Sequence, residues 1–183
     1  MNAEPVTIED ARLIFRNFAG RESEYNREGD RNFGVVLPMD IAKVMEEDGW
    51  NIKYLKPREE DEEPLPWVQV SVSFKRRPPR VVMVTSRGRT TLPEELLEAL
   101  DYADIASVDL ILNPYNWVVS GRSGVKAYLK SLFVTIQEDE LELKYSELPE
   151  IDIYGNQKAI EAGQDPNVIE AEIVDDDIKA IEA

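Results

Sequence analysis

The stretch SVDLILNPYNWVVSGRSGVKAYLKSLFVTI, Ser107 to Ile136, decides the predicted fold. It contains two apolar runs, Val108 to Leu112 and Val125 to Ile136, whose composition and alternation predict β-strands. Between the runs lies a segment with two aromatic residues, Tyr115 and Trp117. That segment ends in a tight basic turn, Ser-Gly-Arg-Ser-Gly, at residues 120–124.

Strict alternation divides the start of the second run into two faces. The polar face carries Lys126, Tyr128 and Lys130. The opposite face, which we expect in the core, carries Val125, Ala127 and Leu129. Further along, the even-numbered positions, which are polar up to Lys130, are apolar: Leu132, Val134 and Ile136. The pattern therefore predicts a strand that bends or bulges between two parts of a barrel.

A surface of cations and aromatic rings beside an apolar core is suited to single-stranded nucleic acid. Cations neutralise phosphates, and rings stack on unpaired bases. The competing interpretation is an ordinary amphipathic strand with solvated lysines, and for this strand alone the two interpretations are evenly matched.

Composition excludes several classes of protein. The chain has no cysteine and no histidine, so it lacks disulfides, zinc–thiolate sites and the commonest general base. The N-terminus, MNAEPVTIED, does not read as a signal peptide, and no apolar run is long enough for a transmembrane helix. We expect no cofactor, no bound metal and no membrane association. The acidic loop from Pro57 to Pro66 is interpreted as solvated rather than metal-binding.

The net charge of −16 is unevenly distributed. Residues 149–183 hold ten acids and two bases, whereas Trp67 to Thr135 holds nine bases and six acids. An acidic total therefore conceals a mildly basic body with acidic appendages. We expect a domain at residues 1–148 and a flexible acidic tail at residues 149–183.

Strands and short helices follow from periodicity elsewhere in the chain. Further strands are expected at Ala11 to Phe18, Phe33 to Leu37, Trp50 to Lys56, Trp67 to Phe74, Val81 to Val84 and Leu141 to Tyr145. In the first, Leu13 and Phe15 should share a face. Helices are expected at Met39 to Asp48, with Ile41, Val44 and Met45 inward, and at Leu92 to Leu100, with Leu96, Leu97 and Leu100 inward. The loop Gly20 to Asn32 carries Arg21, Arg27 and Arg31 around Tyr25, and we favour a solvated loop over a binding loop.

These elements predict a mainly β protein. The helices do not alternate regularly with the strands, which argues against a parallel doubly wound sheet. The expected fold is an OB-fold-like small β-barrel with inserted short helices.

The run Gly124 to Val134 resembles the final barrel strand of phage-encoded single-stranded DNA-binding proteins. The order of other pieces is similar too: an opening strand with Phe, a helix before Gly49-Trp50, a Pro-rich insertion and Asn113-Pro114-Tyr115-Asn116-Trp117. The resemblance covers roughly residues 11–145. It implies an OB-fold, and an acidic tail that recruits replication or recombination proteins. Asp175, Asp176, Asp177 and Ile178 are similar to the acidic tip of such tails, although Lys179 to Ala183 follows them and no terminal aromatic does.

The favoured hypothesis is sequence-independent binding of single-stranded DNA during phage-type replication or recombination, in the host cytoplasm. Phosphate contacts are assigned to Arg76, Arg77, Arg80, Arg87, Arg89, Arg122, Lys126 and Lys130. Stacking candidates are Trp50, Tyr54, Tyr115, Trp117 and Tyr128, of which at least half should be core. Homo-oligomerisation stays open.

Two other classes compete with this hypothesis. The net charge favours an acidic DNA mimic, inhibitor or protein-interaction module, but five arginines between Lys75 and Arg89 disfavour it. A nuclease would use acids such as Asp101, Asp104 and Asp109, yet their spacing does not form a paired metal-binding motif, so we expect no enzyme.

Overall fold

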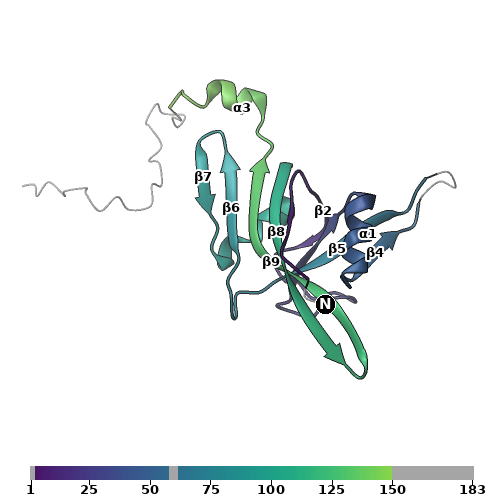
Figure 1. The fold of residues 1–183 in the computed structure, drawn as a ribbon. Helices are drawn as coiled ribbons and strands as arrows, with labels where there is room; N and C mark the ends of the chain where they lie inside the picture. The colour runs from purple at the N-terminus through teal and green to yellow at the C-terminus, as the bar shows by residue number, and fades with distance from the viewer. Residues whose placement is uncertain (1–2, 58–61, 150–183) are drawn as a thin grey trace, which may run out of the picture. The chain divides into compact units, whose positions relative to one another are not determined.

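The computed structural model describes residues 3–57 and 62–149 of the chain. It divides into two units, Met1–Leu143 and Lys144–Ala183, and the first holds every described strand (Figure 1). The strands are β1 (Val6–Ile8), β2 (Arg12–Asn17), β3 (Arg31–Val36), β4 (Ile52–Leu55), β5 (Leu65–Val72), β6 (Arg80–Thr85), β7 (Gly88–Thr91), β8 (Ile105–Val119) and β9 (Arg122–Ile136). The helices are α1 (Met39–Glu47), the 3-10 helix η1 (Glu94–Leu96), α2 (Ala99–Tyr102) and α3 (Glu140–Tyr145).

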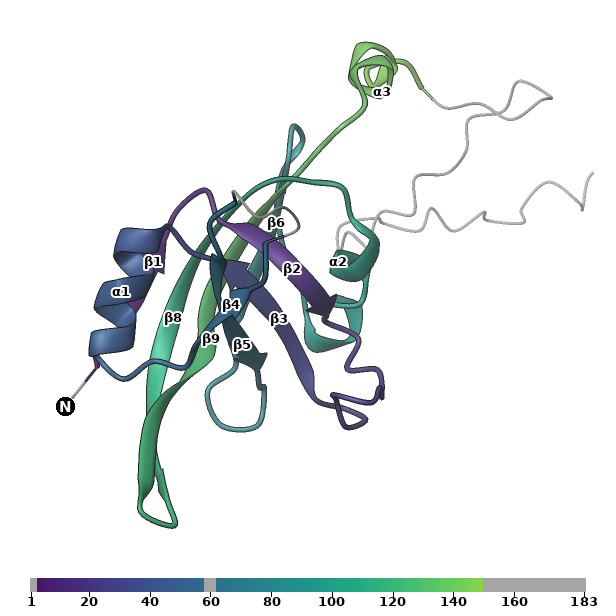
Figure 2. The same cartoon turned by 90° about the vertical axis from the view of Figure 1, so that its right-hand side faces the viewer.

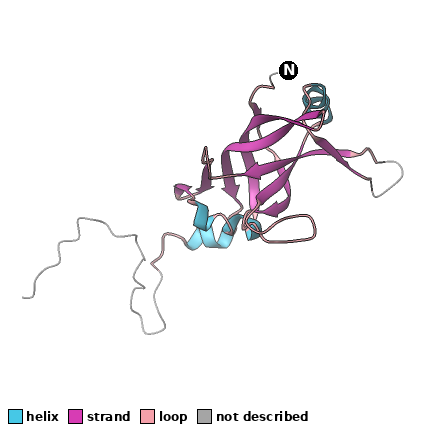
Figure 3. Ribbon diagram, turned by 90° about the horizontal axis from the view of Figure 1, so that it is seen from below, coloured by secondary structure: helices cyan, strands magenta, loops and turns pink. Residues whose placement is uncertain are grey.

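The protein is mainly β, as predicted, with a few short helices (Figure 3). One sheet contains all nine described strands in the order β1-β8-β9-β5-β3-β2. β4 pairs with β5, β6 with β9 and β7 with β6. None of the helices in the described ranges is long and apolar enough to cross a membrane.

β8 and β9 form a hairpin that projects past the neighbouring strands (Figures 1 and 2). Its tip is a two-residue turn in which Ser120 and Gly121 have φ of 50° and 78°. Two positive φ values identify a type I′ turn, whose twist matches that of paired strands. The segment with Tyr115 and Trp117 is therefore part of β8, and the two apolar runs extend into strands of 15 residues each.

A bulge in β9 confirms the predicted change of face. Ile111 pairs with Ser131 and Leu112 with Leu129, which leaves Lys130 as the extra residue. Before the bulge Val125, Ala127 and Leu129 are buried, and after it Leu132 and Val134 are buried. The bulge also separates two parallel neighbours on one edge of β9, because β5 pairs at Ala127 and Tyr128 and β6 pairs from Ser131 onward.

The N-terminal segment provides the strands at both ends of the sheet order, β1 and β2. β1 pairs with β8, and β2 pairs with β3. Between them, the Ala11 amide donates to the Val108 carbonyl at 2.7 Å. β1 and the start of β2 therefore lie along β8, although the paired strands do not form a closed ring.

The core is a single apolar cluster, formed by the buried side chains of one face of the sheet together with residues from the helical segments. β5 supplies Val68, Val70 and Val72, as its alternation predicts. Phe18 and Phe33 stack with ring centroids 4.9 Å apart. Residues from α1 and from the η1–α2 segment complete the cluster: Ala42, Met45, Leu97 and Leu100.

Several expectations are corrected by the structure. β1 and β7 are not among the expected strands, because β1 is only three residues long and β7 has no apolar residue; they pair with β8 and β6. The helix expected at Leu92 to Leu100 is a 3-10 turn followed by a four-residue helix, so Leu96 is exposed. Val44 is also exposed, and the last expected strand is the helix α3.

β2 contains a further correction. Its pairing with β3 shifts between Ile14 and Asn17, and Phe15 has a φ of 50°. Phe15 therefore leaves the inward face of Leu13 and becomes exposed.

The facing of β9 can be tested at Leu129, which is 4% exposed. Replacing Leu129 with Asp should unfold the domain, because burying an unpaired carboxylate costs several kcal/mol, comparable to the stability of a small domain. Lys130→Asp, one residue away on the exposed bulge, is the control and should keep a cooperative thermal transition by circular dichroism. A folded Leu129→Asp variant would contradict the facing of the strand.

Candidate nucleic-acid interface

A groove of about 700 Å³ lies between three parts of the first unit. One wall is formed by residues 25–32, which are the end of the β2–β3 connection and the first two residues of β3. The floor is the outer face of β5, and the other wall is the arm of the β8–β9 hairpin. The hairpin contributes Trp117, Lys126 and Tyr128, three of the residues that the sequence assigned to nucleic acid.

The hairpin wall has this composition because of its register. Tyr115 pairs with Lys126, Asn113 with Tyr128 and Trp117 with Gly124, so these side chains share one face. The Lys126 ammonium lies 5.2 Å from the Tyr128 ring centroid, and the Tyr115 and Tyr128 rings meet edge to face at 5.8 Å. Cation and rings therefore form one continuous surface.

Trp117 packs against the backbone of the opposite strand. A Cβ atom on Gly124 would lie 2.9 Å from Cζ2 of Trp117, which is closer than side chains tolerate. Glycine at this position allows the indole to lie flat on β9, with part of its surface exposed to the groove.

The floor of the groove is uncharged. Gln69, Ser71 and Ser73 alternate with the buried valines of β5, and Ser71 is the register partner of Tyr128. Lys75 follows at the end of this face. Small polar side chains leave space above the sheet, and their hydrogen-bonding groups do not require a particular base.

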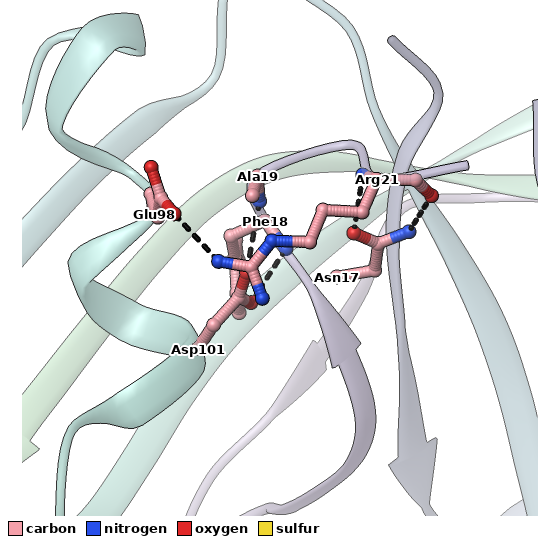
Figure 4. Close-up of polar contacts among 6 residues, drawn as sticks. All are labelled: Asn17, Phe18, Ala19, Arg21, Glu98 and Asp101. Atoms are coloured by element: carbon pink, nitrogen blue, oxygen red, sulfur yellow. Dashed lines mark hydrogen bonds and ion pairs between the residues drawn. The ribbon is translucent and has the colours of Figure 1, made fainter. Parts of the chain in front are cut away.

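The start of the β2–β3 connection, which precedes the groove wall, is held by acidic side chains of the η1–α2 segment (Figure 4). The Asp101 carboxylate accepts hydrogen bonds from the amides of Phe18 at 2.7 Å and Ala19 at 3.0 Å. Arg21 donates to Glu98 at 2.5 Å, and its backbone is bonded in both directions to the Asn17 side chain. The hydrogen bond to Glu98, followed by that to Tyr102, raises the pKa of Arg21 above its ordinary value.

Two further contacts fix the part of the loop that faces the groove. Asn26 donates from Nδ2 to the carbonyls of Arg21, Arg27 and Asp30. Arg31 donates from Nη1 to Glu94 at 2.6 Å, and both residues line the groove. The Arg31 Nε is buried and has no hydrogen-bond partner among the described residues.

Cations outnumber acids around the groove. The four cations are Arg27, Arg31, Lys75 and Lys126, and the two acids are Asp30 and Glu94. Arg27, Arg31 and Lys75 were not assigned to the site from the sequence. The sequence marks Arg27 and Arg31 as part of a cationic loop around Tyr25, but it does not show that they lie beside Lys126, because the pairing of distant strands brings them together. Arg27 and Asp30 are exposed, as a solvated loop predicts, and they also line the groove, whereas Arg31 is partly buried.

The other predicted cations are spread along the sheet. Lys130 lies on the bulge and Arg122 beside the hairpin tip. The Arg80 guanidinium lies 5.7 Å from the centroid of Phe133, on the outer side of β9. Arg76 and Arg77 follow Lys75 in an exposed connection. Arg87 and Arg89 lie at the β6–β7 hairpin, beside the C-terminal end of β9 and away from the groove.

Three predicted stacking residues do not line the groove. Tyr115 lies beside it, in edge-to-face contact with Tyr128. Trp50 is 3% exposed and belongs to the core, where its backbone bridges Val125, so it cannot stack on a base. Tyr54 is exposed, but its hydroxyl donates to Glu46 of α1 at 3.1 Å. Partial desolvation, followed by that contact with Glu46, raises the pKa of Tyr54.

Two remaining expectations concern the acidic tail and metal binding. Asp175, Asp176, Asp177 and Ile178 lie outside the described residues. Within the described ranges, no group of three or more acidic side chains is arranged to hold a metal ion.

Comparisons with known proteins identify a family and structures of similar fold. A family model described as "Putative phage ssDNA-binding domain" matches residues 1–183. The single-stranded DNA-binding protein of bacteriophage Enc34, solved with ssDNA, has a TM-score of 0.52 at 14% identity, covering 74% of this chain and 88% of that one. Its C-terminal truncation has a TM-score of 0.50 at 13% identity, covering 74% and 87%. A search of curated proteins finds no match. The chain therefore belongs to the phage single-stranded DNA-binding domain family.

Proposed function

We propose that the chain binds single-stranded DNA, without sequence preference, in the groove between the loop, β5 and the hairpin. The observation that carries this proposal is the joining of Trp117, Lys126 and Tyr128 with Arg27 and Lys75 around one uncharged floor. Membership of the family supports it, and the cations around the groove argue against a DNA mimic.

In this proposal, cations on all sides of the groove contact phosphates, and the rings of the hairpin wall contact bases. Arg27, Lys75 and Lys126 take phosphates, and the exposed surfaces of Tyr115, Tyr128 and Trp117 take bases. Stacking is tolerant of sequence because every base has a π-face, and it contributes about 1–3 kcal/mol per base. Binding of fluorescent oligo-dT, with duplex DNA as competitor, is the direct test, and preference for the duplex would contradict it.

Lys130 and Arg80 extend the cationic surface along β9 beyond the groove. Both lie on the outer side of the strand, one on the bulge and one above Phe133. We infer that they contact the backbone of strands longer than the groove, with Arg76 and Arg77 beside the Lys75 end.

The sheet is inferred to be an OB-like, partly open barrel. The parallel pairing of β5 with β9 and the bond between Ala11 and Val108 support this inference. In such barrels, oligonucleotides bind across one face between two loops. The β2–β3 connection and the β8–β9 hairpin are the loops that would flank DNA here.

The acidic segment 149–183 is proposed as a regulatory tail. With ten acids and two bases, it would compete with DNA for the basic surface, and replication or recombination proteins would release it by binding its acids. A protein that acts on phage DNA in this way would work in the host cytoplasm.

Charge reversal tests the DNA face. Replacing both Lys126 and Lys130 with Glu should abolish binding of oligo-dT while the thermal midpoint changes little, since both side chains are exposed. Lys43→Glu with Lys56→Glu changes the net charge equally, but on α1 and after β4, and should retain most of the affinity. Equal losses in the two double variants would show that only total charge matters.

Salt dependence tests the phosphate contacts. The logarithm of the association constant should fall linearly with the logarithm of salt concentration, with a slope near −0.7 per phosphate contact on single strands. A fluorescence titration at several salt concentrations measures this slope. A flat response with measurable affinity would contradict the assignment of cations to phosphates.

Tail removal tests the competition. A chain ending before Pro149 should fold and bind oligo-dT more tightly at low salt, because charges interact within a Debye length of about 8–10 Å. A full-length chain with the tail acids replaced by their amides should bind like the truncated chain. Loss of the circular dichroism spectrum on truncation would instead assign the tail a structural role.

A further inference from the structure

Phe15 has an unusual backbone and an exposed ring. It lies in the β2 bulge with a φ of 50°, a region that bulky residues rarely adopt. Its side chain is 60% exposed. Glycine would adopt this conformation without strain. The aromatic ring therefore adds an apolar surface that the bulge itself does not need.

The ring of Phe15 is oriented by Trp67. The two rings meet edge to face, with centroids 5.2 Å apart and planes at 61°. Trp67 is itself fixed: a Cβ on Gly34 would lie 2.9 Å from its Cε3 atom, and the Lys53 ammonium lies 5.0 Å from its centroid. Trp67 is thus packed between neighbours, and Phe15 keeps the larger exposed surface.

This cluster is continuous with the groove. Lys53 donates from Nζ to Oε1 of Gln69 at 2.9 Å, and Gln69 lines the groove. Trp67 lies two residues before Gln69 on the same outer face of β5, a separation of about 7 Å. A DNA strand that left the groove along this face would reach Lys53 first, which contacts Gln69, and then Phe15, which contacts Trp67.

We propose that Phe15 is a second stacking platform for single-stranded DNA, with Lys53 as its phosphate contact and Trp67 as its support. The platform takes a base of the strand that continues from the groove past Gln69. This inference rests on the proposed function, and it concerns only oligonucleotides long enough to reach beyond the groove.

A length series tests the platform. Oligo-dT of about 4 to 16 nucleotides spans the site sizes of domains of this kind. Phe15→Gly removes the ring but suits the backbone, so the thermal midpoint should not fall. Affinity for short oligonucleotides should be unchanged, whereas affinity for long ones should fall roughly fivefold to a hundredfold. Phe15→Trp should retain the affinity for long strands.

Tyr54→Ala removes an exposed ring on the side of α1 and should bind like the parent at every length. If Phe15→Gly also matches the parent at every length, or weakens short and long strands equally, the platform is wrong while the groove stands. A lower midpoint with unchanged binding would assign the ring a structural role and overturn the proposal. Failure of the parent to bind any oligonucleotide would refute the proposed function itself.

Discussion

The bulge at Lys130 is the constraint on which the rest of the sheet depends. Before the bulge the buried side chains of β9 are at odd-numbered positions, Val125, Ala127 and Leu129. After the bulge they are at even-numbered positions, Leu132 and Val134. Without it, one half of the strand would turn its apolar side chains outward, because a one-residue shift exchanges the two faces. The bulge also lets β5 and β6 pair with successive parts of one edge, and so places the uncharged floor beside the hairpin face.

Acidic residues have an architectural role beside this surface. Asp101, Glu98 and Glu94 bond the loop from the side of the η1–α2 segment, by accepting from backbone amides and from two arginines. Arg27, Lys75 and Lys126 have no ion pair within 4 Å among the described residues. Net charge is therefore a poor guide to binding here, since many acids serve the fold or lie in the segment after residue 149.

Much of the fold follows from local periodicity, whereas the site does not. Alternation in β5 and β9 is strict because one face of each is core, and even the bulge is visible as a change of parity. The groove brings Arg27, Lys75 and Lys126 to one site, although they lie in three separate regions of the chain and share no pattern that links them. The strands β1 and β7 were missed for a related reason, since β1 is only three residues long, β7 has no apolar residue, and each pairs with an edge that distant residues provide.

The aromatic residues show most clearly where such reasoning stops. Periodicity does not distinguish a ring that packs from a ring that stacks on a base. Trp50 lies in the core, Trp67 is packed over Gly34, and Trp117 lies over Gly124 with part of its surface toward the groove.

Both tryptophans on the outer face thus lie over a glycine, a pairing that only the register reveals. A ring that covers such a gap is held rigidly by its own sheet and keeps only an edge or part of a face exposed. The more exposed rings beside them, Tyr115 and Phe15, are each in edge-to-face contact with a neighbouring ring. Trp67 therefore supports Phe15, and Trp67 can take this position because Gly34 beneath it lacks a side chain.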